Sequence, residues 1–175
     1  MDIVQSVQAA LARAEAAEDR TQADAHPEAS HDADPAVRIV GIHANVRVST
    51  SFGDVPAQLL RPRDMLRTRD GNFATIRRIE KVGLDEDYLN YHPEAQPVLV
   101  RAGAFGQDCP RQDALFAPGQ LLQTEARRFG TEFRCAAELS GHPKVMRSPT
   151  APIIYYVIDC GRPATILAER VWTQI

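Results

Sequence analysis

The sequence contains three cysteines and five histidines, the side chains best suited to metal binding and nucleophilic chemistry. The cysteines are Cys109, Cys135 and Cys160. They are widely spaced and include no Cys-x-x-Cys pair, unlike the ligands of structural zinc sites. We therefore expect small buried side chains or unmodified thiols, and no metal or cofactor. Three histidines precede a proline, which favours extended or turning chain in exposed loops: His26, His92 and His142.

Hydroxyl and basic side chains form two further groups. The hydroxyls of residues 49–51 fit a strand and turn, where Ser and Thr commonly satisfy backbone groups. Four arginines stand in alternating pairs: Arg61, Arg63, Arg67 and Arg69. They could give a hairpin a face that contacts an anion or nucleic acid, but a solvated strand face is the commoner explanation, so nucleic-acid binding is not expected. No Gly-x-Ser-x-Gly, P-loop or dinucleotide fingerprint is present.

Residues 46–71 carry the clearest structural pattern. Val46 and Val48 alternate with polar residues, which predicts a half-buried strand, and residues 52–54 predict the turn of a hairpin. Residues 65–68 predict another strand, and the Asp70-Gly71 pair that follows is a strong hairpin turn. Two successive hairpins are therefore expected in this part of the chain.

This order of elements resembles the opening of the Hint (Hedgehog/intein) domain in its bacterial form, where Pro-Gly-Asp precedes a strand ending in Thr-Arg-Asp-Gly. Here Arg63 replaces the glycine of Pro-Gly-Asp. The similarity continues in residues 92–94, 97–106, 110–115 and 166–169, so that it covers roughly residues 38–175. The resemblance implies an all-β, flattened, pseudo-twofold fold with short helical turns and a former active site in a central cleft.

Hint domains cut or splice their own backbone. A Cys or Ser attacks the preceding peptide carbonyl, and a histidine activates the scissile amide. The family's spacing puts the nucleophile at Gly41, which has no side chain. The family's Ser-Pro-x-His motif falls on residues 117–120, where Ala117 replaces the hydroxyl and Gln120 the imidazole. The resemblance therefore implies that the nucleophile and the activating histidine are both lost.

Three further positions bear on activity. Val157 and Pro163 stand where related domains often carry histidines. His43 lies close to Gly41, but a base without a nucleophile has nothing to activate. The resemblance thus implies a degenerate Hint domain without self-cleavage or splicing, kept as an interaction or structural module with an unspecified protein partner. Two alternatives remain open: residual autoproteolysis through other residues, and a regulatory binding module whose acidic tail covers the basic hairpin face.

Charge is divided unevenly along the chain. Residues 1–36 hold eight acidic residues against two arginines, a net charge of −6 that leaves about +3 for the rest of a chain whose total is −3. Four apolar residues near the start recur at helical spacing: Ile3, Val4, Val7 and Leu11. Residues 1–20 therefore predict an amphipathic helix, and residues 21–36 an acidic flexible linker that lacks core-forming side chains. The Hint-like domain is expected to comprise residues 37–175.

Short apolar or alternating runs separated by Gly, Pro and Asp follow residue 37, which is typical of an all-β body. Beyond the two hairpins, the expected strands are residues 37–40, 73–80, 98–101, 121–123, 133–135, 145–147, 153–158 and 165–167. Single helical turns are expected at residues 84–91 and 135–139. The chain has 44% apolar residues, no apolar run of membrane length and no Sec signal pattern at its start. We therefore expect a soluble cytoplasmic protein without membrane contact, while export by another route stays open.

Overall fold

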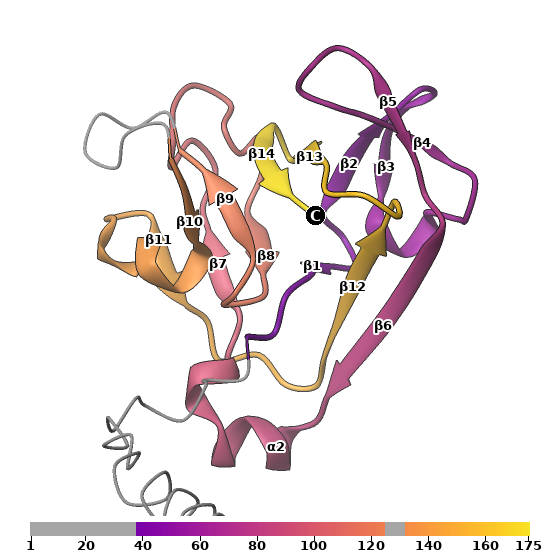
Figure 1. The fold of residues 1–175 in the computed structure, drawn as a ribbon. Coiled ribbons are helices and arrows are strands. Elements are labelled where there is room, and N and C mark those ends of the chain that lie inside the picture. The colour runs from indigo at the N-terminus through magenta and orange to yellow at the C-terminus, as the bar shows by residue number, and fades with distance from the viewer. Residues whose placement is uncertain (1–37, 125–131) are drawn as a thin grey trace, which may run out of the picture. The chain divides into compact units, whose positions relative to one another are not determined.

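The structure, a computed structural model, describes residues 38–124 and 132–175, which form two antiparallel sheets (Figure 1). The predicted N-terminal helix and acidic linker lie outside these residues. The first sheet has the order β11 (Val145–Arg147), β7 (Val98–Val100), β8 (Ala114–Phe116), β1 (Ile42–His43), β12 (Ile153–Asp159), β6 (Arg78–Leu84). The second has the order β10 (Phe133–Cys135), β9 (Leu121–Gln123), β14 (Val171–Gln174), β13 (Thr165–Ala168), β2 (Arg47–Thr50), β4 (Met65–Arg67), β5 (Phe73–Thr75), with β3 (Gly53–Pro56) paired to β2.

The helices of the described residues are short. They are the α-helix α2 (Glu86–Tyr91) and the 3-10 helices η1 (Ala57–Leu59), η2 (Pro93–Ala95) and η3 (Ala136–Gly141). Within this part of the chain no helix has the length and apolar character needed to cross a membrane. The elements α2 and η3 confirm the helical turns predicted at residues 84–91 and 135–139. The predicted all-β fold class is confirmed.

Both predicted hairpins are present. β2 pairs with β3, and β4 pairs with β5 through the turn at Asp70-Gly71. Gly71 has a φ of +83°, a left-handed backbone conformation that glycine adopts without steric cost. Asp70 braces this turn, because its carboxylate accepts hydrogen bonds from the Thr68 hydroxyl, from Asn72 N at 3.2 Å and from Asn72 Nδ2 at 3.0 Å. The local signal for the hairpin is therefore matched by local hydrogen bonds.

These hydrogen bonds lower the pKa of Asp70 from 3.8 to about 2, and the bond from the Thr68 hydroxyl has the largest effect. A lowered folded-state pKa means that the ionised carboxylate favours the folded protein. Its contribution to stability is complete above the unfolded pKa near 3.8 and is lost as the pH falls towards 2. We expect denaturant unfolding to show a smaller loss of stability across this pH window in Asp70→Asn than in the unsubstituted protein. Equal losses in the two proteins would contradict this assignment.

The single strand predicted at residues 73–80 is wrong. This segment forms two strands in different sheets, β5 and β6. Ile76 N donates to Asp64 O, beside β4, at 2.9 Å, whereas Arg77 N donates to Asp159 O, in β12, at 2.8 Å. The chain thus changes sheet between two neighbouring residues, and Figure 1 shows β6 running from the β4–β5 hairpin towards α2.

The strand predicted at residues 37–40 is also wrong over its described part, because residues 38–40 form no strand.

The β13–β14 hairpin was not predicted from the sequence. Its turn residues, Glu169 and Arg170, have φ values of +47° and +65°, and they lack the Asn-Gly signature of such a turn. The Glu169 side chain is buried, and its Oε1 accepts hydrogen bonds from Arg47 N at 2.9 Å and Gln112 Nε2 at 2.8 Å. Contacts distant in sequence therefore hold a backbone conformation that the local sequence disfavours.

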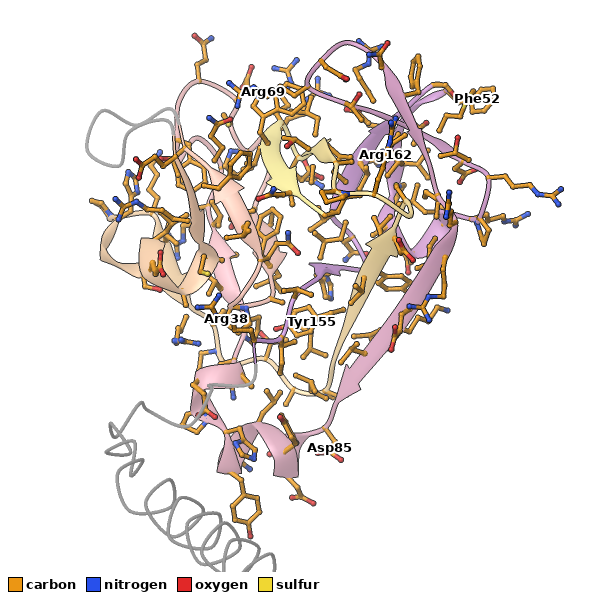
Figure 2. The ribbon with its side chains drawn as sticks, viewed as in Figure 1. Arg38, Phe52, Arg69, Asp85, Tyr155 and Arg162 are labelled. Carbon is orange, nitrogen blue, oxygen red and sulfur yellow. The ribbon has the colours of Figure 1, made fainter. Side chains whose placement is uncertain are left out.

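Side chains of both sheets meet in one buried apolar cluster, whose fully covered members include Val48, Leu66, Val98, Phe116, Leu122 and Ile166. A smaller cluster joins α2 to the first sheet, with Leu89 packed in a group that contains Leu84, Ile153 and Tyr155. The Asp85 carboxylate caps α2 by accepting a hydrogen bond from Tyr88 N at 2.8 Å (Figure 2). These two clusters fix the position of β12, which borders the candidate site.

Candidate functional site

Gly41 and Gln120 are in direct contact. The Gly41 N–H donates to Gln120 Oε1 at 2.9 Å in a buried setting. At the other end of the same amide, Gln120 Nε2 donates to Gln174 O, in β14, at 2.7 Å. Gln120 is only 4% exposed. Its side chain therefore links the segment that precedes β1 to the last strand of the chain.

Ala117 lies on the other side of Gly41. Ala117 N donates to Gly41 O at 3.0 Å, and Gly119 N donates to Ile39 O at 2.9 Å. Residues 39–41 thus run along residues 117–119. Their approach is so close that a Cβ on Gly119 would lie 2.9 Å from Ile39 O. The three positions singled out in the sequence, Gly41, Ala117 and Gln120, are therefore brought together by the fold.

The backbone of Gly41 leaves no ordinary place for a side chain. Its φ is +131°, a conformation that residues with a Cβ rarely adopt. A Cβ built at this position would lie 3.0 Å from Tyr155 Cβ and 3.1 Å from Tyr156 O. Tyr155 is labelled in Figure 2 on β12, the strand paired with β1. β12 thus closes the space into which a nucleophile at position 41 would project.

A cavity of about 390 Å³ opens beside this contact. Its walls are mostly apolar and are formed by Arg38, Val40, Gly41, Gly119, Gln120, Leu121, Cys135, Val157, Ile158, Pro163, Gln174 and Ile175. Both positions aligned with the family's further histidines, Val157 and Pro163, are in this wall. Ala117 is fully buried and does not line the cavity. Four of the five positions compared in the sequence therefore face one space.

The other candidate side chains lie elsewhere. His43 pairs with Tyr155 in the first sheet, and burial lowers the pKa of its imidazole. The hydroxyls at 49 and 50 close the first hairpin, because Ser49 Oγ donates to Asp54 Oδ1 at 2.6 Å and Thr50 Oγ1 donates to Gly53 O at 2.8 Å. No group of three His, Cys, Asp or Glu side chains suited to a metal occurs within residues 38–124 and 132–175.

Gln174 and Cys135 are among the wall residues that sequence reasoning missed. Gln174 binds Gln120 through its backbone carbonyl, which any residue could provide, so no sequence signal marks this contact. Cys135 was expected to be a buried residue or an unmodified thiol, and the structure places it, partly exposed, in the cavity wall at the end of β10. Its place beside Gly119 and Gln120 depends on backbone bonds such as Ala136 N to Gln120 O, at 2.9 Å, which join segments distant in sequence.

Comparisons with known proteins identify the family and the fold. The family model described as Hint domain matches residues 40–174. A variant of the MchDnaB-1 intein has a similar structure, with 15% identity, a TM-score of 0.51 and coverage of 75% of this chain and 97% of its own. A variant of the gp41-1 intein is similar with 10% identity, a TM-score of 0.50 and coverage of 77% and 98%. No curated protein matches the sequence. The inteins share the fold, and the family match establishes that this chain belongs to the Hint domain family.

Proposed function

We propose that this protein is a Hint domain that neither cleaves nor splices its own backbone and that serves as a structural or interaction module. The observation that carries the proposal is the cavity beside Gly41. Its wall contains Gly41, Gln120, Val157 and Pro163, at the places where the family's spacing predicts the nucleophile and histidines. Gly41 has no side chain, and the side chains of the other three residues can neither attack a carbonyl nor exchange a proton near neutral pH.

The contact between Gly41 and Gln120 supports this reading. In an active domain the histidine must reach the scissile amide. Here Gln120 stands at that position, and its Oε1 accepts a hydrogen bond from the Gly41 nitrogen. An amide oxygen accepts the N–H bond but supplies no proton to a departing amine. The same amide is held at its other end by Gln174 O. The side chain acts as a cross-link between two segments rather than as an acid or base.

The alternative of residual autoproteolysis through other residues needs a nucleophile near the scissile bond, and the thiol in the wall of this cavity is Cys135. An acyl shift uses a nucleophile on the residue that directly follows the scissile carbonyl, because attack then closes a five-membered ring. Cys135 does not follow Val40. The residues that line the cavity also include no histidine that could activate its thiol. The geometry therefore favours the non-cleaving module.

The test is the intact mass of the purified full-length protein after long incubation, with and without added thiol or hydroxylamine. We expect one species of unchanged mass, because neither the Val40 carbonyl nor the Gly41 nitrogen has a catalytic partner. A fragment that ends at Val40 would overturn the proposal. If such a fragment formed, its loss in Cys135→Ala would assign the activity to Cys135, while persistence would assign it to other residues.

A further inference from the structure

A second cavity lies at the junction of two loops and shares Pro163 with the cavity beside Gly41. The turn between β4 and β5 and the loop between β12 and β13 enclose about 310 Å³. Arg69 comes from the turn and Arg162 from the loop, and Thr68, Asp70 and Thr165 also line the space. The bond from Arg69 N to Thr165 O, at 3.0 Å, joins the two segments. Figure 2 labels both arginines, which lie in the upper half of the view.

The guanidinium of Arg69 is oriented by a neutral partner. Its Nη1 donates to Oε1 of Gln123, a buried residue of β9, at 2.5 Å. The ion pairs found among the described residues are Arg78 with Glu80, His92 with Glu94, and Arg170 with Asp108. Arg69 and Arg162 are in none of them, so neither charge is neutralised by a carboxylate at contact distance within residues 38–124 and 132–175. Among the described residues no hydrogen bond takes up the remaining side-chain donors of Arg69 and Arg162, so these donors can serve a ligand.

The loop that carries Arg162 is fixed by its neighbours. Gly161 N donates to Asp159 Oδ1 at 2.6 Å, and Gly161 has a φ of +73°. A Cβ at Gly161 would lie 2.3 Å from Arg77 Nε, so the Arg77 guanidinium packs directly against this backbone. Arg77 N in turn donates to Asp159 O at 2.8 Å. The loop is therefore held in place, with the charge of Arg77 beside it.

Asp70 is the one acidic residue in the wall of this cavity. Its oxygens accept hydrogen bonds from Thr68 and Asn72, so they are occupied within the turn. Two arginines against one aspartate leave the wall with a net positive charge. Because a guanidinium presents parallel N–H donors that match the oxygens of a phosphate, this wall suits an oxyanion. The charge of Asp70 opposes such a ligand and limits its affinity.

We propose that this cavity binds a small oxyanion of the phosphate or phosphate monoester class, held by Arg69 and Arg162. The volume, about 310 Å³, is at the lower end of the range for small-ligand sites, which suits a compact ligand better than a polymer segment. Arg69 belongs to the alternating arginines that the sequence analysis interpreted as a solvated strand face. The proposed site gives this one arginine a binding role. It is independent of whether the Hint centre cleaves.

The test uses the full-length protein and inorganic phosphate as the probe. Amide ¹H–¹⁵N spectra are recorded during titration at constant ionic strength, with chloride as the replaced anion. We expect saturable shifts that centre on residues 68–74 and 162–165. Arg69→Gln and Arg162→Gln should each weaken binding by about tenfold or more, because each removes a charge-assisted contact. Arg101→Gln, which makes the same charge change at an exposed residue outside the cavity, should bind phosphate as the unsubstituted protein does.

A variant that should gain affinity sharpens the test. Asp70→Asn removes the opposing charge and keeps a side chain that can accept hydrogen bonds in the turn, so phosphate should bind severalfold more tightly. A purely structural role of these residues predicts no gain. The proposal is overturned if phosphate gives no saturable shift at millimolar concentration, or if folded Arg69→Gln and Arg162→Gln bind as Arg101→Gln does. Binding of a single-stranded oligonucleotide to this face without binding of phosphate would also overturn it, in favour of a polyanion surface.

Discussion

Gln120→Ala is expected to lower the free energy of unfolding by about 3 kcal/mol, because it orphans two backbone groups at once. Gly41 N–H would lose its acceptor and Gln174 C=O its donor, and the first of these two bonds is buried. An unsatisfied buried polar group costs about 1–3 kcal/mol, and the volume vacated by the side chain adds to this. Denaturant unfolding of the full-length protein measures the change.

Two companion variants make this result interpretable. Gln58→Ala removes an exposed glutamine whose Nε2 donates to Asn45 Oδ1 at 3.4 Å, and it should change stability by less than about 0.5 kcal/mol. Gln120→His should lose less stability than Gln120→Ala, since an imidazole can accept the Gly41 N–H bond. If Gln120→Ala were as stable as Gln58→Ala, the Gln120 side chain would not be the cross-link between the two segments.

Local signals predicted much of the fold. The β4–β5 hairpin was predicted because Asp70-Gly71 meets the conformational requirement of the turn within the turn itself. The β13–β14 hairpin was missed because Glu169 and Arg170 adopt positive φ in a turn where Glu169 is held by Arg47 and Gln112, contacts that no local pattern reveals. The break between Ile76 and Arg77 was missed for a related reason, since the pattern of buried and exposed residues does not show that the two belong to different sheets.

The candidate site shows the same division. Family spacing identified Gly41, Ala117 and Gln120, and the fold brings these positions together by hydrogen bonds between Gly41 and each of the other two. The spacing could not show that Gln120 also binds Gln174 O, because that acceptor is a backbone group. Nor could it show the backbone conformation of Gly41, which depends on how closely β12 approaches. The sequence thus identified which residues stand at the site. It could not predict the hydrogen bonds and the backbone conformation that determine what Gly41 and Gln120 do there.

That geometry predicts a large effect at Gly41. Gly41→Ala is expected to destabilise the protein by about 2–6 kcal/mol, because strained backbone and overpacking each cost about 1–3 kcal/mol. Its φ is +131°, and a Cβ would meet Tyr155 Cβ at 3.0 Å and Tyr156 O at 3.1 Å. The backbone oxygen cannot turn aside as a flexible side chain could, since it belongs to β12, which pairs with both β1 and β6.

A series of three glycine substitutions separates the two causes. Gly83→Ala, in β6 with nothing within 4 Å of the new Cβ, should be close to neutral. Gly53→Ala, also in open space but with a φ of +109°, should lose only the strain energy, about 1–3 kcal/mol. Gly41→Ala should lose clearly more than Gly53→Ala. Equal losses would show that β12 yields to the new side chain, and a cysteine at position 41 could then be accommodated. A larger loss means that a nucleophile could return to this position only if β12 first moved away.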